Sequence, residues 1–271
     1  TSGFAGRVAA AKGDSDALMA LYQQLRNLPL RADFPYREPD DLDTILSLSS
    51  GKGKADQERF FQEDTLTDKL YGAWLGRCIG CALGKPLEKD PFVDGNKQGG
   101  GWLHIQRWLK GANAWPLGDY VPGNSTAGSE YGLVIQCPDS QKERIRFMET
   151  DDDIRYLVIG LLIAEQFGND FTPDQVAAMW QTYLPARQCC TAELQAYINS
   201  LNTEIADNEE RWAYIRTYLN PYREWIGAQI RVDQYAYVNA GYPLTAAKAA
   251  FQDARFTPVK NGVYGAMFTA A

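Results

Sequence analysis

The order of apolar and polar residues predicts helices along most of the chain. Beyond residue 141, apolar residues recur at helical spacing in segments that are separated by short polar stretches. Thr172 followed by Pro173 is a typical helix start, because the Thr side chain can cap the first turn and proline is well tolerated there. The helices expected in this part of the chain are 143–167, 173–184, 191–201, 208–218, 222–239, 244–255 and one from 261 onward. Strand-like alternation is weak and occurs around "YGLVIQC", so we expect an all-α fold with little or no sheet.

The first 62 residues differ in organisation from the rest. Residues 14–27, "DSDALMALYQQLRN", carry leucines at helical spacing after an aspartate. The stretch "FPYREPDD" then breaks the pattern, and a further short helix is followed by a Gly- and Lys-rich link. We therefore expect residues 1–62 to form an N-terminal helical extension and residues 63–271 to form a single compact helical domain without internal repeats.

A helix predicted at residues 65–84 carries glycine at every fourth position. The segment and its exit read "TLTDKLYGAWLGRCIGCALGKPLE", and the glycines are Gly72, Gly76, Gly80 and Gly84. Each interior glycine costs about 1 kcal/mol relative to alanine, so the spacing predicts a flat ridge that another helix backbone or a ligand approaches closely. Pro86 ends the helix and leaves Glu88 just beyond it. Arg77 and Lys85 interrupt the apolar pattern, which argues against a membrane-embedded glycine zipper.

Composition and charge exclude several classes of protein. The 271 residues carry a formal net charge of −7 without a Lys/Arg cluster, which argues against binding to a nucleic-acid backbone. No run of about 18 apolar residues occurs and the N-terminus has no signal-type apolar core, so we expect no membrane insertion. Five cysteines are an odd number, which fits a reducing cytoplasm better than a disulfide framework. The chain begins at Thr1 and stops within an apolar pattern, so we expect a piece of a longer protein that is truncated at its C-terminus.

Three consecutive carboxylates precede the apolar segment that begins at residue 154. Asp151, Asp152 and Asp153, here called the acidic triad, directly follow Thr150. Two unit charges about 5 Å apart repel by roughly 3 kcal/mol at an effective dielectric constant of ~20, so this crowding at the entrance of a buried helix needs compensation. One interpretation is an N-cap at Thr150 with carboxylates that interact favourably with the helix dipole. The other is a site for a hard cation such as Mg²⁺, which prefers oxygen ligands. The residues alone leave both open.

Other groups are weaker candidates for chemistry. Cys78 and Cys81 form a C-x-x-C pattern inside the glycine helix rather than at a helix start after a strand, so we expect them to be small core residues. Cys189 and Cys190 have no further Cys or His at zinc-binding spacing. His104 is the only histidine and lies among tryptophans in a predicted amphipathic helix at 102–111. We therefore expect acid–base chemistry to fall to carboxylates.

Four segments, in this order, resemble the ADP-ribosylglycohydrolase family, including the dinitrogenase-reductase-activating glycohydrolases. The segments are "GAWLGRCIGCALGKPLE", "TDDD" before a buried helix, "NPYREWIGAQIRVDQYAY" and "NGVYGAMFTAA". The resemblance covers roughly residues 66–271 and corresponds to the N-terminal two-thirds of the family's domain. It implies an all-helical fold around a site for two Mg²⁺ ions, which hydrolyses the bond between C1″ of ADP-ribose and a modified acceptor. The implied partner is an ADP-ribosylated substrate or an ADP-ribose-like small molecule.

The resemblance also implies roles for individual residues. The family's metal ligands match Thr150, Asp151 and Asp152. A glutamate that lies near the scissile ribose in relatives matches Glu88, so Glu88 and Asp152 are the implied catalytic carboxylates. The family's glycine-rich substrate loop corresponds to "EWIGAQIR", in which Gly227 and Arg231 are retained as implied substrate-binding residues.

The chain also departs from the family pattern. Asp153 stands where many members have threonine, Cys81 replaces a frequent aspartate, and residues 224–226 are bulkier than the usual loop. A second metal motif of the Asp-x-Asp-Thr type would follow "NGVYGAMFTAA", beyond Ala271. The alternative to an enzyme is therefore a non-catalytic scaffold of the same fold that binds a nucleotide-like ligand or has a structural role.

Overall fold

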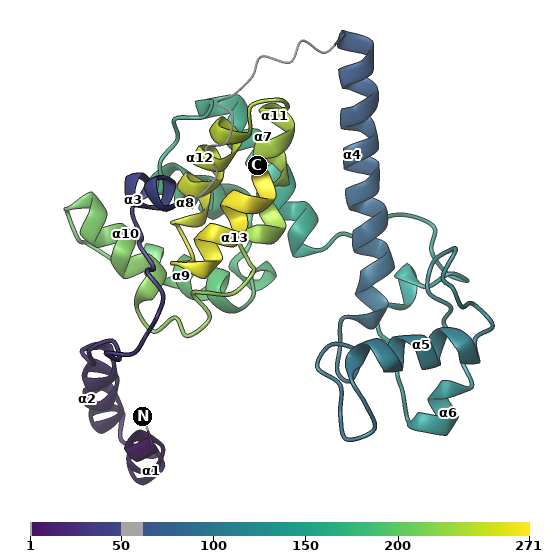
Figure 1. Ribbon diagram of the computed structural model, residues 1–271, viewed down its shortest axis with the longest axis horizontal. Coiled ribbons are helices and arrows are strands. Elements are labelled where there is room, and N and C mark those ends of the chain that lie inside the picture. The colour runs from purple at the N-terminus through teal and green to yellow at the C-terminus, as the bar shows by residue number, and fades with distance from the viewer. Residues whose placement is uncertain (1, 50–61) are drawn as a thin grey trace. The chain divides into compact units, whose positions relative to one another are not determined.

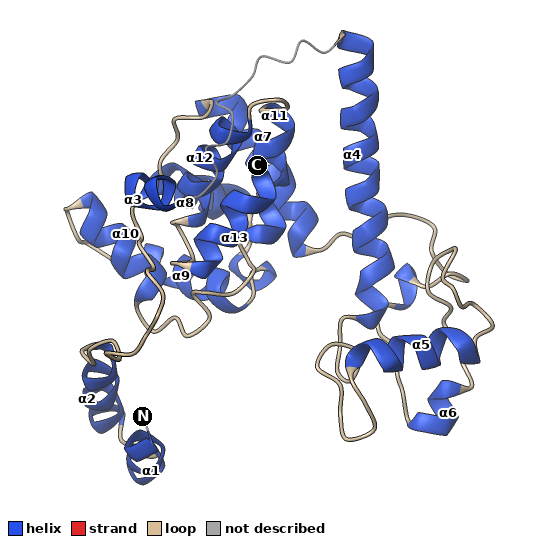
Figure 2. Ribbon diagram, viewed as in Figure 1, coloured by secondary structure: helices blue, strands red, loops and turns tan. Residues whose placement is uncertain are grey.

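The computed structural model describes residues 2–49 and 62–271. The described residues divide into two compact units, one up to Glu38 and one from Pro39 to Ala271. Helices and connecting loops make up both units, and no strand occurs among the described residues (Figure 2). The all-α prediction is therefore confirmed. The weak alternation around "YGLVIQC" follows α6 (Ala127–Tyr131) and forms a loop, in which Leu133 is buried while Val134 is 60% exposed.

The first unit contains α1 (Ser2–Ala10) and α2 (Ser15–Arg26). Asp14 caps α2 by accepting a hydrogen bond from the backbone N–H of Ala17, which explains why the helix begins where the polar-to-apolar pattern changes. Leu21 is its buried apolar residue. The predicted boundary between extension and domain adjoins the Gly- and Lys-rich link, which lies outside the described residues, so that boundary stays a prediction.

The larger core of the second unit is built by helices from the C-terminal half of the chain. Trp180 lies at its centre, stacked on Tyr156 with ring centroids 4.8 Å apart and meeting Phe256 edge-on at 5.1 Å. The short helix α3 (Leu42–Leu48) packs its apolar side against this core. Helices α12 and α13 lie side by side in Figure 1. The core helices are α7 (Asp152–Phe167), α8 (Pro173–Tyr183), α9 (Thr191–Leu201), α10 (Asn208–Thr217), α11 (Asp233–Val238), α12 (Pro243–Ala254) and α13 (Asn261–Ala270).

Two of the predicted helices are shorter than expected. The helix predicted at 143–167 begins only at Asp152, because the backbone carbonyls of Glu149 and Thr150 accept hydrogen bonds from Lys85 instead of from a helical turn. The helix predicted at 222–239 is replaced by an irregular segment, the 3₁₀ turn η4 (Gln229–Arg231) and the short α11. In that irregular segment the buried side chain of Glu193, from α9, lies against the backbone of Gly227. A continuous helix would not allow this contact.

A smaller apolar cluster forms around α5 (Gly101–Gly111) and α6. Phe92 and Trp108 meet edge-on with centroids 6.1 Å apart, and the Trp108 indole donates a hydrogen bond to the backbone carbonyl of Pro122. His104 is fully buried in α5 and hydrogen-bonds through its ring to Asn96. The lone histidine is therefore part of the packing of this cluster.

Helix α4 (Glu63–Gly84) continues into the 3₁₀ turn η1 (Lys85–Leu87), as the position of Pro86 predicts. Ala82 is its buried residue, whereas Tyr71 and Leu75 are 68% and 46% exposed. Apart from the backbone of α4 itself, no described atom lies within 4 Å of a Cβ placed on any of its four spaced glycines, so no described helix approaches the glycine ridge. The approach of a ligand stays a prediction. None of the helices described, α4 included, is both long and apolar enough to cross a membrane.

Candidate functional site

The acidic triad lies where α7 begins. Asp151 is the N-cap residue and its carboxylate accepts a hydrogen bond from the backbone N–H of Asp152 at 2.9 Å. Thr150, the predicted N-cap, lies one residue earlier and is exposed, so the cap is shifted by one position. Asp152 and Asp153 occupy the first turn, where the positive end of the helix dipole favours negative charge. The capping interpretation therefore accounts for part of the acidic triad.

Lys85 neutralises one side of the acidic triad. Its ammonium group lies 3.5 Å from the Asp151 carboxylate and 3.3 Å from the carboxylate of Glu149, while its side chain is only 7% exposed. It also donates to the carbonyl oxygens of Glu149 and Thr150. Although burial acts to lower it, the pKa of Lys85 is raised by the carboxylates of Asp151 and Glu149. Lys85 is therefore a charged, buried counter-ion of Asp151.

Arg77, from the middle of α4, neutralises the other side. It lies 3.7 Å from the Asp153 carboxylate and 3.2 Å from that of Asp233 at the start of α11. The same guanidinium donates to the backbone carbonyl of Ile230 in η4. Asp153 further accepts a hydrogen bond from the Cys81 thiol at 3.2 Å, so two of the residues that depart from the family pattern contact each other. Arg77 thus connects the acidic triad to the segment that contains the predicted substrate-binding residues.

Asp152 is the member of the acidic triad that forms no ion pair with a described Lys or Arg. Partial burial, followed by the neighbouring charge of Asp151, raises the pKa of Asp152 to about 6. A carboxylate with this pKa can exchange a proton near neutral pH, or it can gain a cation that would lower its pKa again. Its chemical environment is therefore distinct from those of Asp151 and Asp153.

Glu88 lies just beyond η1, within electrostatic range of the acidic triad. Partial burial, together with the charges of Asp151 and Asp153, raises the pKa of the Glu88 carboxyl group. Its backbone carbonyl accepts a hydrogen bond of 2.7 Å from the Gln136 side chain, which fixes the chain at this point. The structure thus brings Glu88 and the acidic triad into one charged region.

The two predicted substrate-binding residues belong to a different environment, which we call the Arg231 network. Arg231 is 1% exposed and donates to the carboxylates of Glu193 and Asp253, at 3.1 and 2.5 Å, and to the Thr257 hydroxyl at 3.0 Å. Its guanidinium also lies over the ring of Trp180, 5.1 Å from the centroid. A ligand could reach Arg231 only if this network opened, so its assignment as a substrate-binding residue stays a prediction.

Gly227 lies directly over the Arg231 network. A Cβ placed on Gly227 would lie 2.0 Å from a carboxylate oxygen of Glu193, so the close approach requires glycine. The loop that resembles the family's substrate loop is therefore seated on a buried charge network. The sequence did not point to Glu193, Asp253 or Thr257, because Glu193 lies 38 positions before Arg231 and Asp253 lies 22 positions after it, and only folding brings them together.

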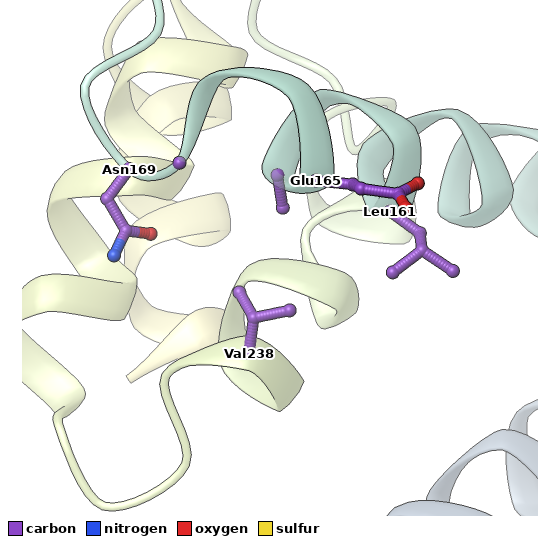
Figure 3. Close-up of a pocket in the computed structure, with 6 residues that line it drawn as sticks. Leu161, Glu165, Asn169 and Val238 are labelled. Atoms are coloured by element: carbon purple, nitrogen blue, oxygen red, sulfur yellow. The ribbon is translucent and has the colours of Figure 1, made fainter.

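A shallow pocket lies at the opposite end of α7 (Figure 3). It has a volume of about 410 Å³ and is lined by residues that include Leu161, Glu165, Asn169 and Val238. The intervening length of α7 places it roughly 15 Å from the acidic triad, at a rise of about 1.5 Å per residue. Its lining has one carboxylate and no cation, so it offers less chemistry than the acidic triad.

The arrangement can hold a cation or move a proton, but it is not a preformed metal site. Over residues 2–49 and 62–271, no three His, Cys, Asp or Glu side chains converge as metal ligands would. The partners that sequence reasoning missed are Lys85, Arg77 and Glu149; of these, only Glu149, two positions before the acidic triad, had a local signal. A family model described as ADP-ribosylglycohydrolase matches residues 62–271. No curated protein and no solved structure gives a significant match.

Proposed function

Since this chain belongs to the ADP-ribosylglycohydrolase family, whose members hydrolyse glycosidic bonds of ADP-ribose, we propose that it is a Mg²⁺-dependent hydrolase. Its substrate would be ADP-ribose linked to a modified acceptor. The observation that carries the proposal is Asp152, a half-buried carboxylate with a raised pKa that the described cations leave unpaired at the start of a core helix. The free thiols of all five cysteines support a cytoplasmic location.

The oxygen atoms in this region support a Mg²⁺ site. Four oxygens of residues 149–151 surround the ammonium of Lys85, and this arrangement of oxygen atoms around a positive charge supports the proposal. We propose Thr150, Asp151 and Asp152 as ligands, in a site that holds two ions when complete. When bound, Mg²⁺ would offset the charge of the carboxylates and orient a water molecule and the ribose hydroxyls.

The protein's own contribution to hydrolysis would come from Glu88 and Asp152. The raised pKa of Glu88 suits it to accept a proton from the attacking water. The water oxygen forms a bond to C1″ and the bond from C1″ to the acceptor breaks. The acceptor leaves with the electron pair and gains the proton that Glu88 has taken from the water. Asp152 would stabilise the positive charge that develops on the ribose ring. The backbone around Gly227 would contact the diphosphate, with Arg231 holding that segment.

The test is Mg²⁺-dependent release of ADP-ribose from an ADP-ribosylated protein, measured by liquid chromatography with mass detection. We expect Asp152→Asn and Glu88→Gln each to lower the rate by about 100-fold or more. Glu130→Gln, which removes an exposed carboxylate on α6, is the matched control and should keep the full rate. Full activity of Asp152→Asn would refute the proposal.

A second candidate is a scaffold that binds ADP-ribose without hydrolysing it. It is favoured by the pairing of Asp151 with Lys85 and of Asp153 with Arg77, because both carboxylates are already neutralised within the protein. Calorimetry with ADP-ribose separates the two candidates. Binding of ADP-ribose by a chain that does not cleave the linked substrate would favour the scaffold.

A further inference from the structure

The ammonium group of Lys85 is surrounded by oxygen atoms of the protein. Its ammonium lies 3.2 and 3.4 Å from the backbone carbonyls of Glu149 and Thr150. It lies 3.3 and 3.5 Å from the carboxylates of Glu149 and Asp151. Two carbonyl and two carboxylate oxygens around one positive charge are the kind of oxygen donors that a hard cation accepts.

Neighbouring residues and hydrogen bonds fix the position of the Lys85 side chain. Pro86 follows Lys85 directly in η1, the Lys85 side chain is buried, and its two backbone acceptors belong to the loop that leads into α7. Burying an ammonium group is costly unless charged partners compensate for the lost water. Glu149 and Asp151 supply that compensation, so the ion pair is a built-in feature of the entrance to α7.

We propose that Lys85 is the resident cation of this site and that a divalent ion must displace it from Asp151 in order to bind there. The inference rests on the metal part of the proposed function and adds a specific residue that controls it. A carboxylate oxygen that faces an ammonium at 3.5 Å is not free to coordinate a second cation, and the two positive charges repel each other. Binding of the divalent ion at Asp151 and release of Lys85 are therefore one coupled event.

The first test compares Mn²⁺ affinity, measured from the paramagnetic resonance signal of free Mn²⁺, among variants of the whole chain. Lys85→Met removes the charge and keeps the length of the stem, and we expect it to bind Mn²⁺ about tenfold more tightly or better. Lys85→Arg retains the charge and should remain close to the unmodified protein. Adding Asp151→Asn to Lys85→Met should abolish the gain. Equal affinities of Lys85→Met and the unmodified protein, or no binding by either, would overturn the inference.

A second measurement does not depend on whether a variant folds. In the unmodified protein, acetylation of Lys85 by an amine-reactive reagent should increase several-fold when Mg²⁺ replaces an equal ionic strength of NaCl, as followed by peptide mass spectrometry. Exposed Lys110 on α5 serves as the internal control and should not change. Unchanged labelling of Lys85 would overturn the inference. ADP-ribose release that Asp152→Asn abolishes would leave the proposed function intact in that case, so the two failures are distinguishable.

Discussion

At the scale of single residues, the acidic triad is tolerated because its three charges have three different environments. Asp151 caps α7 and pairs with Lys85, and Asp153 pairs with Arg77. Asp152 accepts a hydrogen bond from the backbone N–H of Asp153 but forms no ion pair with a described Lys or Arg. The remaining cost of the crowding appears as the raised pKa of Asp152. This division turns a local repulsion into a single perturbed carboxylate, which is typical of functional sites.

The perturbed carboxylate predicts a pH dependence of stability. Because the pKa of Asp152 rises to about 6 on folding, its contribution is fully present below its unfolded pKa and is lost as the pH rises through about 6. Asp152→Asn removes this loss. The quantity to follow is the free energy of unfolding of Asp152→Asn minus that of the unmodified protein, both measured with a chelator present. We expect this difference to increase by about 1–2 kcal/mol between pH 4 and pH 8, a range that allows for solvent screening. Urea titrations across this range measure it.

Asp119 is the control of opposite sign. Hydrogen bonds from the backbone of Tyr120 and from Lys142 lower the pKa of Asp119, so Asp119→Asn should give no gain in stability as the pH rises. A parallel pH profile for Asp152→Asn and Asp119→Asn would show that Asp152 is not perturbed in the way its environment indicates.

At the scale of elements, two glycines in predicted functional segments differ in what they contact. A Cβ on Gly227 would collide with the Glu193 carboxylate, whereas one on Gly76 would enter open space. We expect Gly227→Ala to destabilise the second unit by about 2 kcal/mol or more, because the loop or the Arg231 network must shift. Gly76→Ala should instead raise the helical content and stability of α4 by up to about 1 kcal/mol.

Circular dichroism and urea unfolding of both variants test this contrast. The loss of stability expected for Gly227→Ala is large, because displacing Glu193 would leave the buried guanidinium of Arg231 with one carboxylate partner fewer. A loss of stability in Gly76→Ala would contradict the expectation for α4 and would indicate that something packs against its glycine face.

The same elements show what could be read from the sequence. Helices α9 and α10 agree with their predicted ranges to within one residue, because their apolar spacing and starting residues are local signals. The predicted helix at 222–239 was wrong, since its break depends on the contact between Gly227 and a glutamate in another helix. The acidic triad is visible in the sequence as a local cluster. Its counter-ion Lys85 is distant along the chain, because even Glu149, the nearest of the carboxylates that Lys85 contacts, lies 64 positions away. The burial of Arg231 had no sequence signal, because arginine is rarely buried.

At the scale of the whole molecule, the second unit contains two apolar cores that polar contacts connect. The larger core surrounds Trp180 and the smaller one surrounds Trp108. Arg77 on α4 holds Asp153 at the start of α7, Asp233 at the start of α11 and the carbonyl of Ile230. These charged contacts of Arg77 form part of the link, together with the rings of Trp74 and Tyr237, whose centroids are 6.2 Å apart. We therefore expect the two cores to respond separately when the charged contacts are removed.

Arg77→Met tests this organisation. The change leaves Asp153 and Asp233 without their cation while the apolar stem of the side chain is retained, so α4 should detach more readily from α7 and α11. Hydrogen exchange followed by mass spectrometry should then show about tenfold or greater loss of protection in α5, which belongs to the smaller core, and a smaller change in α8 of the larger core. Arg211→Met, which removes a more exposed pair with Asp174, is the matched control and should leave α5 unchanged. An equal loss of protection in α5 and α8 would mean that the two cores unfold together, and the connection through Arg77 would then not be the weak point of the second unit.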